Sequence, residues 1–174
     1  MSAGRGVKRR WLAAHIFLAF LCVGAPSAFA SSAPIDAAQI ETWQRAPLHI
    51  KGGSGDTAFH VEIAADAYTQ RHGLMDRETL SKDSGMLFLF GMDARRSFWM
   101  HNTLIPLDMI FIDAQGTIVA IHENAEPRSN EIISPVEFAA SVLEINGGLV
   151  RTLGIRVGDT VEHPALTAVA DGLQ

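Results

Sequence analysis

The sequence has few cysteines, and the position of the one it has limits how the protein can be stabilised. Cys22 is the only cysteine among 174 residues, and it lies in a hydrophobic segment near the start of the chain. The rest of the chain therefore cannot form an internal disulfide, and packing alone must stabilise its fold. A structural zinc site is not indicated either, because the six histidines after residue 30 show no paired spacing and no cysteine accompanies them.

Short catalytic motifs are missing as well. The chain has no Gly-x-Ser-x-Gly turn, no His-Glu-x-x-His pair and no glycine-rich phosphate-binding loop. An enzyme would need a nucleophile with a base, or two carboxylates of different pKa, and only the second arrangement has candidates in this sequence. We therefore expect a protein that is not an enzyme, and we predict no cofactor.

Basic residues are scarce after residue 30. Four of the 14 lysines and arginines precede that point and none of the 19 acidic residues does, which leaves a formal charge of −9 on the remaining chain. No basic cluster offsets this charge. Proteins that bind nucleic acids or anionic membrane surfaces do so largely through such clusters. We predict that neither is a partner.

Residues 1–30 have the three parts of a secretory signal peptide. A cationic start precedes the hydrophobic run Trp11 to Val23, and Ala28-Phe29-Ala30 is a small-x-small cleavage site before Ser31. The run has thirteen residues, whereas a membrane-spanning helix needs about twenty. We predict a periplasmic or secreted protein with no stable membrane anchor after cleavage. A lipoprotein signal acylated at Cys22 and an uncleaved anchor are the alternatives.

The remaining 144 residues fit one domain of ordinary size. A chain of that length buries roughly 68–70% of its unfolded surface, which is enough for a substantial core. Residues 31–46 mix Ala, Pro and Ser, and we expect a flexible leader there. Residues 47–164 form the predicted β domain, and residues 165–174 a weak tail. We expect a monomer.

Short strands dominate the predicted secondary structure. Strict alternation marks residues 57–64 as a half-buried strand, and the continuous run at 85–90 is typical of a strand covered on both faces. Residues 108–113 and 117–123 form a predicted hairpin. Further elements are expected at 47–50, 66–72, 140–145, 149–153 and 160–163. Six to eight strands with one or two short helices predict a β-dominated α+β fold, either a compact single-domain β-sandwich or an open barrel.

Five segments of the chain together resemble a known family. They are RHGLMDR at 71–77, SGMLFLF at 84–90, FWMHNTLIPLDMIFID at 98–113, GTIVAIHENAEP at 116–127 and SVLEINGG at 141–148. From about Leu48 to about His163 the chain resembles the DUF192 family, also called UPF0127, of small and often exported proteins. The resemblance implies a compact β-rich domain and implies no activity. Where the family usually has lysine after Phe-Trp-Met, this chain has His101, so a permanent cation is not available there.

The segment FWMHNTLIPLDMIFID supplies the candidate site. Pro106 fixes its own φ and extends Ile105, which predicts a stiff loop between two strands. We predict a ligand-binding cleft lined by Trp99, Met100, His101, Asn102 and Asp108 and closed by Arg77 and Glu144. Structural roles are the alternatives: Asn102 can hydrogen-bond its own backbone in a turn, Trp99 can pack in the core, and backbone donors or an arginine can match Asp108.

These residues support three hypotheses of different classes. The leading one is an exported, non-enzymatic module that binds a small ligand or an envelope component at this loop. The second is a hydrolase in which Asp108 and Glu144 act as an acid and base pair. The third is a Cu(I)-binding protein that uses methionine thioethers with His101. Methionine is an ordinary filler of hydrophobic cores, which argues against the third.

Overall fold

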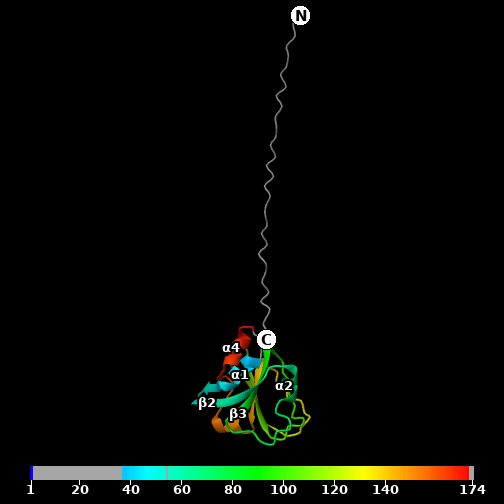
Figure 1. Ribbon diagram of the computed structural model, residues 1–174, viewed down its shortest axis with the longest axis vertical. Coiled ribbons are helices and arrows are strands. Elements are labelled where there is room, and N and C mark those ends of the chain that lie inside the picture. The colour runs from blue at the N-terminus through cyan, green and yellow to red at the C-terminus, as the bar shows by residue number, and fades with distance from the viewer. Residues whose placement is uncertain (2–36, 54, 173–174) are drawn as a thin grey trace. The chain divides into compact units, whose positions relative to one another are not determined.

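The computed structural model describes Met1, residues 37–53 and residues 55–172 (Figure 1). Apart from Met1, the predicted signal peptide with its cleavage site and the first part of the predicted leader lie outside these residues. From Ala37 onward, the described chain belongs to one compact unit. None of the described helices is long and apolar enough to cross a membrane.

Seven strands and four short helices make up the described chain. In chain order they are α1 (Ala37–Arg45), β1 (Pro47–Gly52), β2 (Gly55–Ala64), α2 (Ala67–His72), β3 (Ser84–Ala94), β4 (Leu107–Ile112), β5 (Ile118–Ala125), β6 (Ala139–Asn146), α3 (Leu149–Leu153), β7 (Thr160–Glu162) and α4 (Pro164–Ala170).

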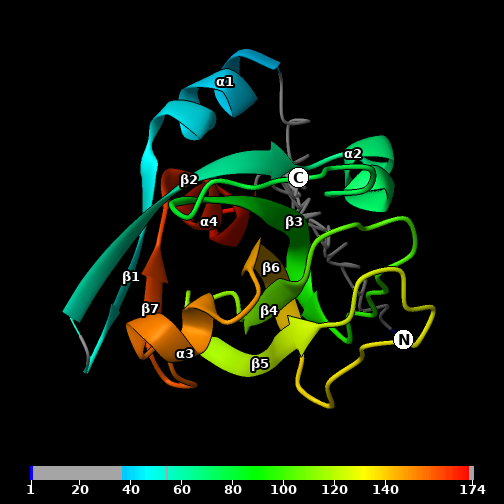
Figure 2. The same cartoon turned by 90° about the horizontal axis from the view of Figure 1, so that it is seen from below.

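The strands form one sheet in the order β5-β4-β6-β3-β2-β1-β7. Neighbouring strands are antiparallel except β2 and β3, which run parallel. The sheet curls until its two edges meet at one end, where Thr117 and Thr160 form an isolated bridge and the Ile118 amide donates to the Asp159 carbonyl at 2.9 Å. Figure 2 shows the curl from below, with β1 and β7 at the left and β4 and β6 near the centre.

This curled half-barrel confirms the predicted β-dominated α+β fold, in its open-barrel form. The predicted helices at 66–72 and 149–153 are present as α2 and α3. The described chain has four helices rather than the one or two expected. The two additional helices, α1 and α4, lie in the regions predicted as leader and tail.

Tertiary contacts explain why α1 and α4 are not predicted from the sequence. Trp43 of α1 is only 4% exposed and packs in the core, and Ala165 and Val169 of α4 are buried with it. His163 joins the two helices, because its Nε2 lies 3.1 Å from the Trp43 carbonyl oxygen while its Nδ1 accepts from the Ala165 amide. Helices this short depend on packing for their stability, and packing of this kind leaves little periodic signal in the sequence.

Two hydrophobic cores lie on opposite faces of the sheet. The inner core, inside the curl, consists of Trp43, Leu48, Ile50, Phe59, Val61, Ile63, Leu87, Leu89, Ile110, Ile112, Ile118, Leu143, Ile145, Val150, Ile155, Val161, Ala165 and Val169. The outer core consists of Ala64, Leu74, Met86, Phe88, Met100, Ile105, Leu107, Met109, Phe111, Ala125, Ala139 and Val142. Both faces of β3, β4 and β6 are therefore covered, which explains their continuous apolar sequences.

Candidate functional site

Asp108, at the start of β4, is fully buried and satisfied by backbone amides. One carboxylate oxygen accepts from the Asn124 amide at 2.7 Å and from the Gly148 amide at 2.9 Å. The other accepts from the Val150 amide at 2.8 Å. Its side chain is 0% exposed. Asp108 therefore ties the end of β5 to the beginning of α3, and its three hydrogen bonds leave it no role facing solvent.

Glu144 faces the other side of the sheet. On β6 it is the cross-strand partner of Met109 on β4 and of Met86 on β3, and both methionines belong to the outer core. Asp108 is instead paired with Ile145, which belongs to the inner core. Successive side chains of a strand point to opposite faces, so Asp108 and Glu144 are separated by the sheet itself.

Because of this separation, Asp108 and Glu144 cannot form the catalytic pair that the hydrolase hypothesis requires. A pair of catalytic carboxylates must flank one scissile bond, with the two groups about 5–10 Å apart across a shared cleft. Asp108 and Glu144 share no cleft, because a covered sheet lies between them. The expectation that these two residues act as an acid and base pair is therefore corrected.

The loop from Trp99 to Asn102 sends its side chains in different directions. Met100 is buried in the outer core, whereas Trp99 is 46% exposed. The His101 ring packs against Trp99 with centroids 5.0 Å apart, and its Nδ1 lies 3.0 Å from Asn130 Oδ1. Asn102 has φ of 55°, a left-handed conformation that asparagine tolerates well in turns. The predicted cleft of Trp99, Met100, His101 and Asn102 does not form as a unit.

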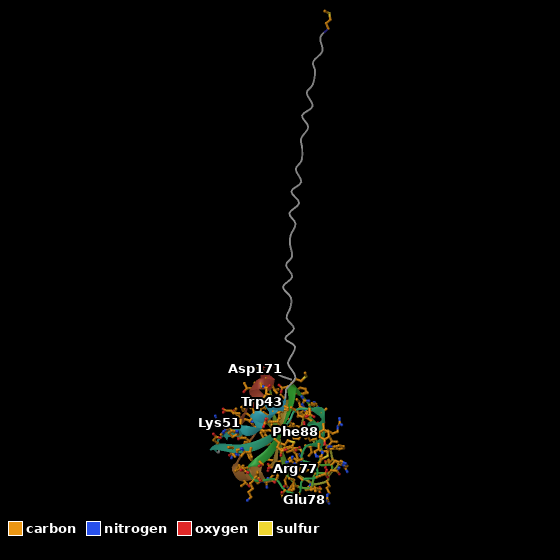
Figure 3. The ribbon with its side chains drawn as sticks, viewed as in Figure 1. Trp43, Lys51, Arg77, Glu78, Phe88 and Asp171 are labelled. Carbon is orange, nitrogen blue, oxygen red and sulfur yellow. The ribbon has the colours of Figure 1, made fainter. Side chains whose placement is uncertain are left out.

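Arg77 is engaged elsewhere. Its guanidinium makes a two-pronged salt bridge with the Glu62 carboxylate of β2, at 2.5 and 2.7 Å, and the hydrogen bond from Arg77 lowers the pKa of Glu62. Figure 3 shows Arg77 below Phe88 in that view, nearer the loops at the lower edge of the molecule. Arg77 therefore does not close a site over Glu144.

Unlike Glu62, Glu144 has no salt-bridge partner among the described residues. The side chain is only 4% exposed, and no hydrogen bond or ion pair reaches its carboxylate from residues 37–53 or 55–172. Burial raises the pKa of Glu144 to about 8. A buried carboxyl group without a cation or donor is costly to ionise, which makes Glu144 the exceptional polar side chain of the outer core.

A cavity of about 210 Å³ opens beside Glu144. We call it the Glu144 cavity; its lining consists of residues 70–75, Phe88, Phe90, residues 97–99, Thr103 and Glu144. Phe98 stands at the centre of its aromatic wall, with its ring edge-on to Phe88 at 5.2 Å and to Phe90 at 6.3 Å. Trp99 and Glu144 are the two predicted site residues that line this cavity together.

Local sequence features place α2 and its following turn over this cavity. The Asp66 carboxylate accepts hydrogen bonds from the amides of Tyr68 and Thr69, and the Asp66 amide donates to the Thr69 hydroxyl, which completes a capping box. Gly73 ends the helix with φ of 52° and ψ of −133°, a conformation that essentially only glycine adopts. A Cβ at Gly73 would lie 3.3 Å from the Phe88 ring and 4.0 Å from Glu144 Oε2, so this glycine also keeps space open beside the carboxyl group.

The sequence indicates only two residues of this site, Trp99 and Glu144, and most of the other lining residues are not predicted. From the sequence, Phe88 and Phe90 belong to the predicted strand at 85–90, and Gly73 directly follows the predicted helix at 66–72. Their segments, at 71–77 and 84–90, are separated in sequence from Glu144 by more than fifty residues. Only the sheet order, which places β3 beside β6, brings them together.

Two larger hollows lie elsewhere on the described surface. One, of about 450 Å³, includes Met100, His122 and Glu126, and the other, of about 590 Å³, includes His49 and His163. His163 has both ring nitrogens hydrogen-bonded. Neither hollow is lined by an unpartnered buried acid, and so the smaller cavity is the better candidate site.

A metal centre finds little support in the described residues. Within residues 37–53 and 55–172, no group of three or more His, Cys, Asp or Glu side chains is arranged to hold a metal ion. For the Cu(I) hypothesis, Met86, Met100 and Met109 are buried in the outer core, whereas His101 is exposed and bonded to Asn130. Met100 and His101 therefore do not converge on one point.

Comparison with known proteins identifies relatives without adding an activity. The family model DUF192, described as "Uncharacterized ACR", matches residues 48–163. A solved structure of a protein of unknown function from Novosphingobium aromaticivorans is 40% identical, with a TM-score of 0.65 over 67% of this chain and 83% of that chain. A solved structure of a putative transcription regulator from Sinorhizobium meliloti is 43% identical, with a TM-score of 0.67 over 68% of this chain and 93% of that chain. No curated protein matches this chain.

Proposed function

This chain belongs to the DUF192 family, and we propose that it is an exported, non-enzymatic protein that binds a small ligand in the Glu144 cavity. One observation carries the proposal: Glu144 is buried, has no hydrogen-bond partner among the described residues and lines a cavity that also contains aromatic rings. Binding pockets are typically apolar clefts with a few polar groups that fix the ligand's orientation. The cavity fits that description on a small scale.

The proposal moves the site away from the loop that the sequence indicated. Trp99 and Glu144 remain as ligand-facing residues. Asp108 and Asn102 are accounted for by backbone geometry, and Arg77 by its salt bridge. A binding role is favoured over catalysis because the described lining holds no hydrogen-bonded nucleophile and base pair: Ser97 bonds to Ser134, and the His72 ring stacks on Tyr68.

Export is the second part of the proposal, and the sequence of residues 1–30 supports it. The partner would be a small ligand or an envelope component in the periplasm or outside the cell. Transcription regulation, for which the Sinorhizobium relative is named, is not favoured for this chain. A formal charge of −9 after residue 30 opposes the contact with DNA phosphates on which such proteins depend.

Ligand binding can be tested with three small probes that share a four-carbon chain: butylammonium, butanol and butyrate. Titrations followed by amide and indole NMR signals of the purified protein should show at least one probe perturbing residues 70–75 and the Trp99 indole. Arg77→Ala is the matched control, since Arg77 is bound to Glu62 outside the cavity, and it should leave binding unchanged. If none of the three probes perturbs these residues, the cavity is not a binding site.

A further inference from the structure

We infer that the ligand of the Glu144 cavity is a small organic ammonium ion, whose N–H groups donate to the Glu144 carboxylate while its apolar part packs against Phe88, Phe98 and Trp99. This inference rests on the proposed function and names the chemical class that the site would select. It follows from three features of the cavity: an acid without a counter-ion, a wall of aromatic rings, and a small volume.

The missing counter-ion is the first feature. An ionised carboxylate in a buried site needs donors or a cation, and Asp108, on the opposite face, obtains three backbone donors. Glu144 obtains none from the described chain, and its cross-strand neighbours are the thioethers of Met86 and Met109. Gln70, which also lines the cavity, already donates its side-chain amide to the Leu89 carbonyl at 2.6 Å. A ligand that brings its own N–H donors and positive charge would complete the site.

The aromatic wall is the second feature. Aromatic rings attract cations through the negative potential of their faces, and the lining includes Phe88, Phe90, Phe98 and Trp99. The chain already uses one of these rings in this way, since the Arg96 guanidinium lies 4.2 Å from the Phe90 centroid. An ammonium ion can combine both attractions, the carboxylate on one side and the rings on the other. A neutral ligand can hydrogen-bond to Glu144 but lacks the charge that attracts the carboxylate and the rings, and an anionic ligand is repelled by the carboxylate.

Size is the third feature. Pockets for drug-sized ligands hold about 300–1,000 Å³, whereas this cavity holds about 210 Å³. The ligand, or the part of it that enters, is therefore a group with a few carbon atoms. Trp99 lines the cavity and is partly exposed to solvent, so its ring is accessible to a group that enters from outside.

Two charged or titratable side chains besides Glu144 line the cavity, Arg71 and His72 of α2. Both are exposed, and the His72 ring stacks on Tyr68 with centroids 5.8 Å apart. The other lining residues near the carboxyl group carry no titratable side chain; they are Phe88 and Phe90 of β3 and Ser97, Phe98, Trp99 and Thr103 of the loop. Neither Arg71 nor His72 contributes to the pKa shift of Glu144, which burial alone produces. The described chain therefore supplies no cation to the carboxylate.

Binding of a cation should be coupled to release of a proton. Because burial raises the pKa of Glu144 to about 8, the protein without ligand holds the neutral acid at pH 6. An ammonium ion needs the carboxylate, and so its apparent affinity should rise about tenfold per pH unit below that pKa and become constant above it. Between pH 6 and pH 8 the expected gain is about fifty-fold.

The test is calorimetric titration of the purified protein with butylammonium, butanol and butyrate at pH 6, 7, 8 and 9, with Glu144→Gln, Arg77→Ala and His72→Gln variants alongside. At pH 8 butylammonium should bind at least about tenfold more tightly than butanol, and its affinity should fall about fifty-fold at pH 6. Glu144→Gln should lose both the preference and the pH dependence. Arg77→Ala should keep both. His72→Gln should also keep the pH dependence, because the inference assigns it to Glu144 rather than to His72.

The outcomes separate this inference from the proposed function. If butanol or butyrate perturbs the cavity residues and binds as tightly as butylammonium, the cavity is a binding site and the ammonium class is wrong. If butylammonium binding is independent of pH, or survives unchanged in Glu144→Gln, Glu144 is not its partner and the inference is overturned. If no probe perturbs the cavity residues, the proposed function fails together with the inference.

Discussion

Asp108 and Glu144 lie on the neighbouring strands β4 and β6 and point to opposite faces of the same sheet. The two carboxyl groups come from similar apolar sequences, yet the fold treats them differently. Asp108 receives three backbone N–H groups, and Glu144 receives none from the described residues. Asp108 therefore stabilises the fold, whereas Glu144 remains unpaired beside a cavity.

Replacing Asp108 with Asn should destabilise the protein substantially. The amide has one acceptor oxygen instead of two and would turn an NH₂ group toward backbone donors. Each buried donor left unsatisfied costs about 1–3 kcal/mol, so a loss of about 3 kcal/mol in the free energy of unfolding is expected. Urea denaturation measures this, with Asp56→Asn, at an exposed position near the start of β2, as a control. A variant as stable as the parent would contradict the structural role of Asp108.

Replacing Glu144 with Gln should stabilise the protein at high pH. The pKa of Glu144 is about 8 in the folded protein against an ordinary value of 4.5. Between these values the folded state keeps a proton that the unfolded chain has released, so stability falls as pH rises through this window. The slope is about 1.4 kcal/mol per pH unit for one group.

The measurement is the free energy of unfolding of both proteins at pH 5, 6, 7 and 8, without ligand. The difference between Glu144→Gln and the parent should grow in favour of the variant with each step. The difference between two proteins cancels the titration of groups that they share. A constant difference across this range would show that the folded Glu144 titrates near its ordinary pKa.

Replacing Trp99 with Leu should weaken ligand binding more than stability. Trp99 is 46% exposed and lines the cavity, and a cation over an exposed aromatic ring gains about 0.5–1 kcal/mol. We expect about a two- to five-fold loss of butylammonium affinity with little change in melting temperature. Trp99→Phe, which keeps a ring, should retain most of the affinity. An equal loss in both variants would argue against a role for the ring face.

Replacing Arg77 with Ala should cost little. Its partner Glu62 is 49% exposed and Arg77 is 34% exposed, and partly exposed ion pairs contribute about 0.2–1 kcal/mol. Because the hydrogen bond from Arg77 lowers the pKa of Glu62, this contribution is present at neutral pH and disappears as acid protonates Glu62. Thermal unfolding of the parent and of Arg77→Ala at pH 7 and pH 3 compares the proteins with Glu62 ionised and with Glu62 protonated. A loss of several kcal/mol would mean that Arg77 has a further partner.

Replacing Trp43 with Ala tests whether α1 belongs to the folded domain. Trp43 is buried in the inner core and its carbonyl bonds to His163, and truncation of a buried Trp costs about 3–5 kcal/mol. We expect a loss of that size in chemical denaturation. Replacement of the exposed Glu137, on the loop before β6, with Ala is the control. If Trp43→Ala is as stable as the parent, residues 37–46 behave as the leader predicted from sequence.

Export is tested directly by mass spectrometry of protein recovered from the producing cell. An N-terminus at Ser31 or a close neighbour, in the fraction outside the cytoplasm, is the expected result. An intact N-terminus in the cytoplasm would contradict the proposal. A lipid-modified Cys22 would support the lipoprotein alternative instead.

Local patterns along the chain are sufficient to predict several secondary-structure elements of this protein. Alternation along residues 57–64 and the apolar runs at 85–90 and 140–145 correspond to β2, β3 and β6, because side-chain period and burial are encoded in consecutive residues. The helix predicted at 66–72, which Asp66 caps, and the turn at Asn102 are also present, since each depends on chemistry within a few positions.

Which polar side chains come together depends on long-range packing and cannot be inferred from local patterns. The sequence showed that Asp108 and Glu144 each need an explanation, but it could not show which core each one faces. Strand register places Asp108 opposite Ile145 and Glu144 opposite Met109, and a shift of one residue would exchange the two faces. The Glu144 cavity likewise joins α2, β3, β6 and the Trp99 loop, whose proximity results from sheet order and long-range packing rather than from any local pattern.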